Sequence, residues 1–480
     1  MLSKIYAAHR KTLRRAGLLA LIFAIVSLLA LELLSHGTAA LFNHAMEEQD
    51  MLRGSIRVER LFSDITGHVY FTNLKWYDPN GELILSIPSG DFRVRIWDVL
   101  TKNYKSTTIQ DLNIYDATVS LHFDENMRLD FIRPSPDMEK MQDDDEAWQK
   151  KVSLDGLSEE ERRAIGEKRR RMQQEKMAKR WKNFNATGKK LKLNLNVHDS
   201  RFEILAHGRH YLMNHVQLTS AIDTTKAMEL SMTIGGFGGI MIGDGIFVNG
   251  CVDFHGEDVP TADLSAVFYE VDPSSLGFGM DLHDKMTLDT YFTGAITHPI
   301  ATGTLAMDEL HVPGLYFTQV QGDVYYENAL LTFTNVSANV FDGTLAAHGD
   351  YNLDTRYYHI YGTGSNLNTA KALPGSGLYC RVAMDLTIAS DGSAKGTRTS
   401  GAFHSDAGRY RLLPFERIAG SFNNIYHDLQ FYDVSLRFAG FDVATDGLRI
   451  ENGKLTLTPI RITDKDGGPL YTYIQKPRGE

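Results

Sequence analysis

The chain has 480 residues, of which 43% are hydrophobic and 23% charged, and a formal net charge of −10 at neutral pH. This composition is typical of a folded globular protein and excludes extensive disorder. The acidic balance argues against a general nucleic-acid-binding protein, because neutralising phosphates requires a basic surface. The two cysteines are too few for a disulfide framework or a cysteine-rich metal site.

The first residues combine a basic tail with an apolar segment. Residues 1–15 contain five basic residues, among them Lys11, Arg14 and Arg15, and no acidic residue. Residues 16–35 carry a single charge, Glu32. A helix of about 19 residues spans roughly 28 Å, which is enough to cross the hydrocarbon core of a bilayer. The positive-inside rule then predicts a transmembrane anchor with its basic tail in the cytoplasm and the rest of the chain on the other side.

The alternative for this segment is a cleaved signal peptide. Thr38, Ala39 and Ala40 offer small residues at a suitable distance after the apolar run. That run is longer than the usual apolar core of a signal peptide, which favours a retained anchor.

Residues 54–133 have the pattern of strands and turns. Tyr77–Gly81 contains the turn residues Asp-Pro-Asn-Gly between two runs of alternating hydrophobicity, as expected for a hairpin. We therefore interpret residues 54–133 as an N-terminal β module.

The pattern changes in residues 134–190, which are rich in charge. Ser158 and Glu161 have the spacing of a capping box and predict the start of a helix of about 27 residues. Its apolar stripe would consist of Ile165, Met172, Met177, Trp181 and Phe184. Two interpretations remain open for this insertion: a solvated helix along a sheet edge, or a basic arm that touches anionic lipid or a partner protein.

Residues 191–470 return to strands and contain a repeat. The segment Leu112–Leu121 aligns without gaps to Leu195–Ile204 in the pattern L-N-[IV]-x-D-x-x-[VF]-x-[IL], and residues 334–341 form a looser third copy. We interpret each copy as a strand, a turn at the aspartate and a returning strand. Repeated units of this kind predict a mainly β fold with an extended, curled antiparallel sheet, shaped as a groove or a solenoid.

The sequence contains no recognisable catalytic, nucleotide-binding or metal-binding motif. Gly235–Gly239 lacks the spacing of a dinucleotide-binding loop, and no G-x-S-x-G sequence is present. His207, His210 and His215 have no carboxylate or cysteine at ligand spacing. Cys251 and Cys380 can pair in an oxidising compartment or remain buried and free. We therefore predict no catalytic residue, no metal and no cofactor, and a protein that is not an enzyme.

The apolar side of so long a sheet needs a cover. About ten residues per strand and turn predict on the order of 25–30 strands, and a large bare apolar surface does not persist in water. The sheet either closes into sandwiches with a dry core or curls into a trough that holds acyl chains. The candidate lining residues for a lipid groove are Leu193, Leu195 and Val197, with Phe202 and Ile204 on the next strand. Alternation alone leaves groove and dry core open.

Four segments of the N-terminal β module, residues 65–74, 78–81, 92–100 and 109–114, resemble the N-terminal module of the AsmA-like family of diderm bacteria. Later units such as residues 340–349 are similar to the repetitive C-terminal half of that family. The resemblance implies an inner-membrane anchor, a bulk in the periplasm, and a β-groove that carries phospholipid toward the outer membrane. It implies no catalytic residues.

The chain also departs from the large members of that family. It is much shorter, residues 471–480 are polar with no outer-membrane docking segment, and residues 134–190 have no counterpart in the family pattern. A partner, such as an outer-membrane assembly or docking protein, or an oligomer is then needed to cross the periplasm.

These observations together predict a membrane-anchored periplasmic protein that binds or conveys phospholipid for outer-membrane lipid homeostasis. The alternative is a non-catalytic envelope scaffold that assists outer-membrane protein assembly. A third interpretation, a carbohydrate-binding module, has only the pairs Tyr325–Tyr326 and Tyr357–Tyr358 in its favour.

Overall fold

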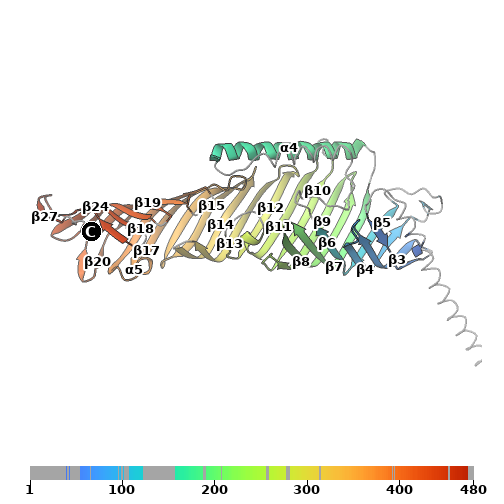
Figure 1. The fold of residues 1–480 in the computed structure, drawn as a ribbon, viewed down its shortest axis with the longest axis horizontal. Coiled ribbons are helices and arrows are strands. Elements are labelled where there is room, and N and C mark those ends of the chain that lie inside the picture. Colours follow the sequence, from blue (N-terminus) through green and yellow to red (C-terminus); the bar gives the residue numbers. More distant parts are fainter. Residues whose placement is uncertain are drawn as a thin grey trace, which may run out of the picture. The chain divides into compact units, whose positions relative to one another are not determined.

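The structure is a computed structural model that describes residues 39–40, 43, 54–64, 66–95, 97–98, 101, 108–122, 157–186, 191–206, 208–255, 259–276, 282–312, 315–391, 393, 395–426, 428–451 and 454–473. The predicted anchor at residues 16–35, and Lys11, Arg14 and Arg15 before it, lie outside this part of the chain. The described residues are mainly in β-strands, as predicted (Figure 1). They form two compact units: unit 1 contains residues 1–152 and 188–240, and unit 2 contains residues 153–187 and 241–480.

Unit 1 is built on one layer of β-strands. Its strands are β1 (Ser55–Arg57), β2 (Arg60–Ser63), β3 (His68–Tyr77), β4 (Leu83–Val94), β5 (Ile109–Tyr115), β6 (Thr118–His122), β7 (Lys192–Ala206), β8 (Arg209–Asp223) and β9 (Ala227–Gly239). Both β1 and β2 pair with β3, and the order continues through β4, the β5–β6 pair, β7 and β8 to β9.

The prediction of a purely antiparallel sheet is wrong at one place in unit 1. Strands β5 and β6 pair with β7 in parallel, whereas the other pairings in this unit are antiparallel. Parallel neighbours need a long connection, and residues 123–191 provide one between β6 and β7. The charged insertion therefore changes the direction in which the next strand joins the sheet.

The two copies of the sequence repeat are neighbours in this parallel pairing. Leu112 lies opposite Leu195, and Leu121 lies opposite Ile204, so the pairing keeps the offset of the sequence alignment. The aspartate of each copy has left-handed backbone, with φ of 54° at Asp116 and 46° at Asp199. Asp199 lies at a bulge inside β7, and Asp116 lies between β5 and β6, which run in the same direction beside β7.

The predicted turn and returning strand are therefore wrong. β7 runs without reversal from Lys192 to Ala206, so Phe202 and Ile204 lie on the same strand as Leu193 and Leu195. The physical reason is that aspartate tolerates the left-handed region as a single residue, and such a residue inside a strand makes a bulge as readily as a turn.

Left-handed polar residues recur inside strands of both units. Besides Asp199 they are Asn73, His215, Glu270, Gln319, Asn335, Asn366 and Asp433. Pairing registers shift beside several of them, as between Val197 and Ser200 in β7 and between Phe333 and Val336 in β15. Each bulge adds a residue to one strand, bends it and increases its twist. The recurring bulges therefore bend and twist the strands of both units.

Unit 2 contains the long helix and the remaining strands. Its elements are α4 (Glu159–Ala186), β10 (Gly245–Asp253), β11 (Thr261–Val271), the short helix η1 (Pro273–Leu276), β12 (Met286–Ala295), β13 (Ile300–Val312), β14 (Leu315–Glu327), β15 (Leu330–Val340), β16 (Gly343–Asn352), β17 (Tyr358–Asn368), α5 (Thr369–Ala372), β18 (Leu378–Ser390), β19 (Arg398–Ser405), β20 (Gly408–Tyr410), β21 (Leu413–Phe415), β22 (Arg417–Ile425), β23 (Asp428–Arg437), β24 (Phe441–Glu451), β25 (Lys454–Leu457), β26 (Ile460–Asp464) and β27 (Pro469–Tyr473). From β10 to β19 each strand pairs antiparallel with the next.

The order changes after β19. This strand pairs with β22, while β20 and β21 form a hairpin that pairs with the start of β18. Strand β24 then pairs with both β25 and β26.

The predicted capping box of α4 is confirmed. The Glu161 carboxylate accepts from the Ser158 backbone N–H at 2.9 Å, and the Glu161 N–H donates to the Ser158 hydroxyl at 3.3 Å. The helix lies along turns at one rim of the unit 2 sheet (Figure 1). It pairs Arg170 with Asp354 in the β16–β17 turn, and it stacks Trp181 on Phe254 after β10 with ring centroids 5.4 Å apart.

The face that α4 turns to this rim includes Trp181 of the predicted apolar stripe but is otherwise largely basic. Arg162, Gly166 and Arg170 follow each other every four residues on one side, and the Arg162 guanidinium lies 5.7 Å from the Tyr357 ring centroid. Met177 is exposed, and the side chain of Phe184 lies outside the described part. The rim presents turn carboxylates and carbonyls, which arginine satisfies better than an apolar side chain.

A buried cluster in unit 1 includes a residue from before the first strand. Ala39 is buried with Val58, Phe71, Ile87 and Ala117. Nearby, the side-chain amide of Asn43 donates to the Val58 carbonyl at 3.0 Å and accepts from the Val58 N–H at 2.8 Å. This amide thus makes the two hydrogen bonds to the Val58 backbone, between β1 and β2, that a neighbouring strand would otherwise make. It ties the chain that follows the predicted anchor to the edge of the sheet.

The bulge at Asp199 gives a stability test. Replacing Asp199 with either Gly or Val removes its hydrogen bond to the His215 ring, which is 2.7 Å long. Glycine adopts the φ of 46° at this position without steric cost, whereas valine has to adopt it with a branched side chain. We therefore expect the free energy of unfolding, measured by urea titration, to be about 1–2 kcal/mol lower for Asp199→Val than for Asp199→Gly. Equal stabilities would show that the bulge imposes no backbone constraint.

The cap of α4 gives a test with pH. Hydrogen bonds, first from the Ser158 backbone and then from its hydroxyl, hold the pKa of Glu161 below its ordinary value of 4.5. A lowered folded pKa means that the cap stabilises the helix above pH 4.5 and is lost as the pH falls through the folded value. Hydrogen exchange of the first turn, corrected for intrinsic rates, should accelerate on this acidification. The Glu161→Gln variant should lack that acid-dependent step.

Candidate functional site: the apolar face of the sheet

The five predicted lining residues lie on β7 and share one face of it. Leu193, Leu195 and Val197 alternate before the bulge, and Phe202 and Ile204 alternate after it. The bulge at Asp199 shifts the alternation by one residue, so that odd positions before it and even positions after it point the same way. Val197 is buried, and the other four are half-buried.

Apolar residues on the neighbouring strands extend this face on both sides. On the parallel side, Leu112, Ile114, Val119 and Leu121 lie opposite Leu195, Val197, Phe202 and Ile204 in that order. On the antiparallel side, β8 places Ile222, Leu218, Met213 and Tyr211 opposite Leu193, Val197, Phe202 and Ile204. The two copies of the repeat thus put matched apolar residues side by side. Apolar rows run across all three strands at Val197, Phe202 and Ile204, whereas Leu195 faces Ser220 on β8.

The degree of burial distinguishes this face from the core of a sandwich. Where two sheets face each other, inward side chains interdigitate in a closed core and lose most of their exposure. Most side chains of the rows on β7 and β8 are instead only half-buried, as are Met228, Leu230, Met232 and Phe237 on β9. In the described part of unit 1, most residues of these rows on β7, β8 and β9 therefore keep part of their apolar surface exposed, whereas Leu112 and Ile114 on β5 pack against the buried cluster around Phe71.

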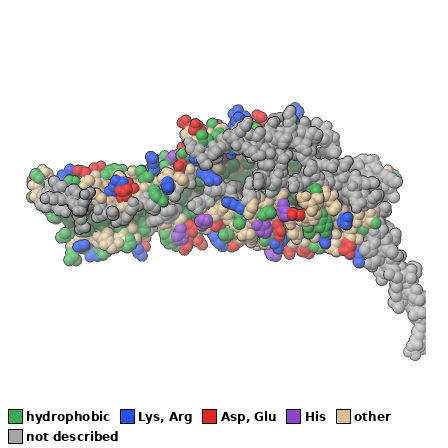
Figure 2. Space-filling model, viewed as in Figure 1, with side chains coloured by type: hydrophobic (Ala, Val, Ile, Leu, Met, Phe, Trp, Pro, Cys, Tyr) green, Lys and Arg blue, Asp and Glu red, His purple; other side chains and the backbone are tan. Residues whose placement is uncertain are grey.

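Unit 2 has the same kind of face with two different degrees of burial. A buried cluster in its middle strands contains Leu305, Met307, Phe317, Val320, Val324, Ala338, Val340 and Leu367. Farther along, Phe403, Phe422 and Phe431 are half-buried and contact each other in edge and tilted geometries, with centroids 6.1 and 6.4 Å apart. Figure 2 shows hydrophobic side chains in a recess between polar rims over these C-terminal strands.

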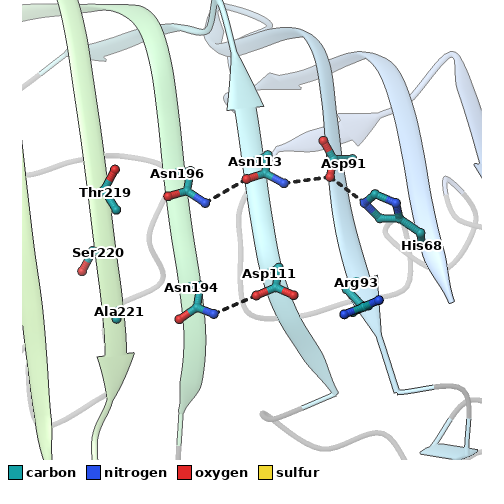
Figure 3. A pocket seen from close by; sticks show the side chains of 10 residues that line it. All are labelled: His68, Asp91, Arg93, Asp111, Asn113, Asn194, Asn196, Thr219, Ser220 and Ala221. Atoms are coloured by element: carbon teal, nitrogen blue, oxygen red, sulfur yellow. Dashed lines mark hydrogen bonds and ion pairs between the residues drawn. The ribbon is translucent and has the colours of Figure 1, made fainter. Parts of the chain in front are cut away.

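The opposite face of unit 1 carries a row of hydrogen-bonded polar side chains. The His68 ring lies 2.7 Å from the Asp91 carboxylate, Asn113 donates to Asp91 at 2.8 Å, and Asn196 donates to Asn113 at 2.9 Å (Figure 3). In the next row Asn194 donates to Asp111 at 2.7 Å. Each bond joins residues directly opposite each other on neighbouring strands, apart from the one to His68.

This polar row fixes the register of the apolar rows behind it. A slip of one residue between β5 and β7 would separate Asn113 from Asn196 and also move every apolar side chain to the other face. Asp91 has only 7% of its surface exposed, so its carboxylate depends on these donors. Partial burial, and then the charge of Asp91, raise the pKa of Tyr115 beside it.

The polar faces also contain two open cavities. One has a volume of about 480 Å³ and is lined in unit 1 by the polar row (Figure 3). The other has a volume of about 760 Å³ and is lined in unit 2 by residues 334–336, 346–348, 361–363, 385–387 and 400–402. Carboxylate, amide and hydroxyl side chains make up most of the lining of the first cavity, which does not suit an acyl chain. The second cavity has a mixed lining that includes Val336, Tyr361 and Leu386.

Other predicted sites have the following outcomes. In the described residues no group of three or more His, Cys, Asp or Glu side chains is arranged to hold a metal ion. Cys251 on β10 and Cys380 on β18 are free thiols, so the disulfide considered from the sequence does not form. The described residues include no helix with the length and apolar character required to cross a membrane.

The polar row was not predicted from the sequence. Its two asparagines stand in the repeat as the N of L-N-[IV], and their shared position was the available signal. Nothing in the sequence pattern pointed to His68 or Asp91, because they belong to two strands that carry no copy of the repeat. Comparison of the chain with family models, with curated proteins and with solved structures gives no match.

The polar row leads to a stability prediction. Asn113→Ala removes the donor to the buried Asp91 carboxylate and the acceptor for Asn196. We expect a loss of about 1–3 kcal/mol in the free energy of unfolding, measured by urea titration, because a buried acceptor loses a partner. The control is Asn194→Ala, which breaks one exposed bond to Asp111 and should cost clearly less. Equal losses would contradict a register-fixing role for the buried row.

Proposed function

We propose that the chain is a membrane-anchored periplasmic protein that binds phospholipid acyl chains on the apolar face of its curled sheets and conveys them toward the outer membrane. The observation that carries the proposal is the set of half-buried apolar rows across β6, β7 and β8, with Phe202 and Ile204 at their centre. Each methylene removed from water on such a surface contributes about 0.8 kcal/mol, so even a loose fit retains a lipid tail.

Three further features support a lipid as the occupant. The rows continue along each strand on both sides of the bulge, and a groove of this kind suits a long flexible chain better than a compact ligand. The headgroup can remain at the polar rim while the tail lies on the apolar face. The resemblance of β3, β4 and β5 to the AsmA-like family, and the basic tail before residues 16–35, agree with an inner-membrane anchor.

The alternative is an envelope scaffold for the assembly of outer-membrane proteins. One observation favours it: the middle strands of unit 2 hold a buried cluster around Phe317 and Val324, which leaves less apolar surface open there. The scaffold would need no bound lipid, so direct detection of lipid on the apolar face separates the two proposals.

Site-specific photocrosslinking in the full chain provides this test. A benzophenone amino acid at Phe202 faces the apolar row, whereas at the neighbouring Arg201 it faces the polar side of the same strand. After irradiation in intact cells, mass spectrometry should find phospholipid attached at position 202 and not at position 201. Crosslinks to protein alone at both positions would leave the scaffold as the better proposal.

A matched pair of charge substitutions completes the experiment. Leu195→Asp places a carboxylate on the apolar row, and Asn194→Asp places one on the opposite face of the same strand. Lipid crosslinked from position 202 should fall at least about threefold in the first variant and remain unchanged in the second, because hydrocarbon does not solvate a charge. A similar yield in both variants would contradict binding on this face.

A further inference from the structure

The hairpin formed by β20 and β21 projects from the sheet of unit 2. It leaves the main order of strands, pairs with the first residues of β18, and stands beside α5 (Figure 1). Its turn is formed by Arg411 and Leu412, and the Arg411 N–H donates to the Gly377 carbonyl at 2.7 Å. The loop after α5 therefore lies next to the tip of the hairpin.

The base of this hairpin is firmly packed. Phe415 is 3% exposed and belongs to a buried cluster with Ile418 and Phe438, whose ring meets it edge-on with centroids 6.5 Å apart. A Cβ at Gly408 would lie 2.5 Å from both Cys380 and Phe415 atoms, so only glycine fits there. The base thus presents the tip in a defined position.

The tip itself is apolar and exposed. Leu412 is 90% exposed and Leu413 57%. Leu373, Tyr379 and Tyr410 around them are also exposed. We use the name hairpin tip for the set Leu373, Tyr379, Arg409, Tyr410, Arg411, Leu412 and Leu413. Two adjacent leucines in water at a turn cost free energy, which burial against a partner would recover.

Cationic and aromatic side chains surround the leucines. The Arg409 guanidinium lies 4.4 Å from the Tyr379 ring centroid, and that of Arg411 lies 5.8 Å from the Tyr410 ring centroid. Residues 408–415 contain both arginines and no acidic residue. Leucine at a tip, tyrosine behind it and arginine beside it is the order of side chains that matches hydrocarbon, interface and phosphate in a bilayer.

We propose that the hairpin tip docks on a phospholipid bilayer, with Leu412 and Leu413 in the acyl region and Arg409 and Arg411 on the lipid phosphates. The charge of the tip complements anionic headgroups. Its small size argues against a protein groove, because each partner in a stable protein interface contributes about 20–30 residues and the tip has only seven. The proposal stands independently of acyl-chain binding on β7.

Flotation of the full chain with lipid vesicles tests this docking. The chain is held in nanodiscs and mixed with protein-free vesicles of phosphatidylethanolamine and phosphatidylglycerol. Recovery of the chain with the vesicles should fall at least about tenfold when Leu412 and Leu413 are both changed to Asp. The control is Ile242→Asp, because Ile242 is 50% exposed and lies outside the tip. Leu195→Asp should also float like the unmodified chain, which separates this result from lipid binding on β7.

A second measurement follows the tip directly. In Leu412→Trp the new indole should be quenched by brominated phospholipid in the vesicles, beyond any quenching of the four native tryptophans in the unmodified chain. Unchanged flotation of the double variant, or no added quenching at position 412, would overturn the proposal. Flotation that requires a membrane protein in the vesicles would overturn it as well, and would assign the tip to that protein.

Discussion

The structure depends on one constraint. A strand in a single-layer sheet forms its backbone hydrogen bonds with the neighbouring strands, but these bonds do not cover the apolar face of the sheet. Alternation along β7 puts Leu195 and Phe202 on that side and Asn196 and Glu203 on the other. The backbone hydrogen bonds are complete without a second layer, so nothing in the pairing forces the apolar rows to close. Their half-burial in unit 1 is the consequence, and it is the physical basis for an occupant that is itself apolar.

Two structural features hold the strands of this open sheet in a fixed register and shape. Polar residues in left-handed backbone, such as Asp116 and Asp199, bend the strands and shift the alternation where they bend, so that both halves of a strand present apolar side chains to the same face. Buried hydrogen bonds on the reverse face, centred on Asp91 and Asn113, hold neighbouring strands in register. A flat sheet without these features would be free to slip, and its exposed apolar face would favour aggregation.

The two parts of the chain that leave the sheets, helix α4 and the hairpin of β20 and β21, contact the protein in different ways. Helix α4 uses Arg162 and Arg170 to bind a turn rim, a contact that charge and hydrogen bonding explain. The hairpin of β20 and β21 has the reverse distribution, with Phe415 buried at its base and Leu412 exposed at its end. Exposed leucine side chains at the end of a hairpin are unfavourable in water. This arrangement therefore suggests that the end of the hairpin binds an apolar surface.

The sequence by itself determined the β class, the capping box at Ser158 and Glu161, and the alternation that places Leu193, Leu195 and Val197 on one face, because these follow from local periodicity and spacing. Only the tertiary structure decided that Asp199 is a bulge rather than a turn, that the two repeats pair in parallel, and that Asp91 and His68 join the asparagines of the repeat. Aspartate in left-handed backbone serves both turn and bulge, so the choice rests on which strand lies beside it. Likewise the sequence pattern did not indicate that Leu412 and Leu413 are exposed, because their exposure depends on Phe415 taking the buried position at the base of the hairpin.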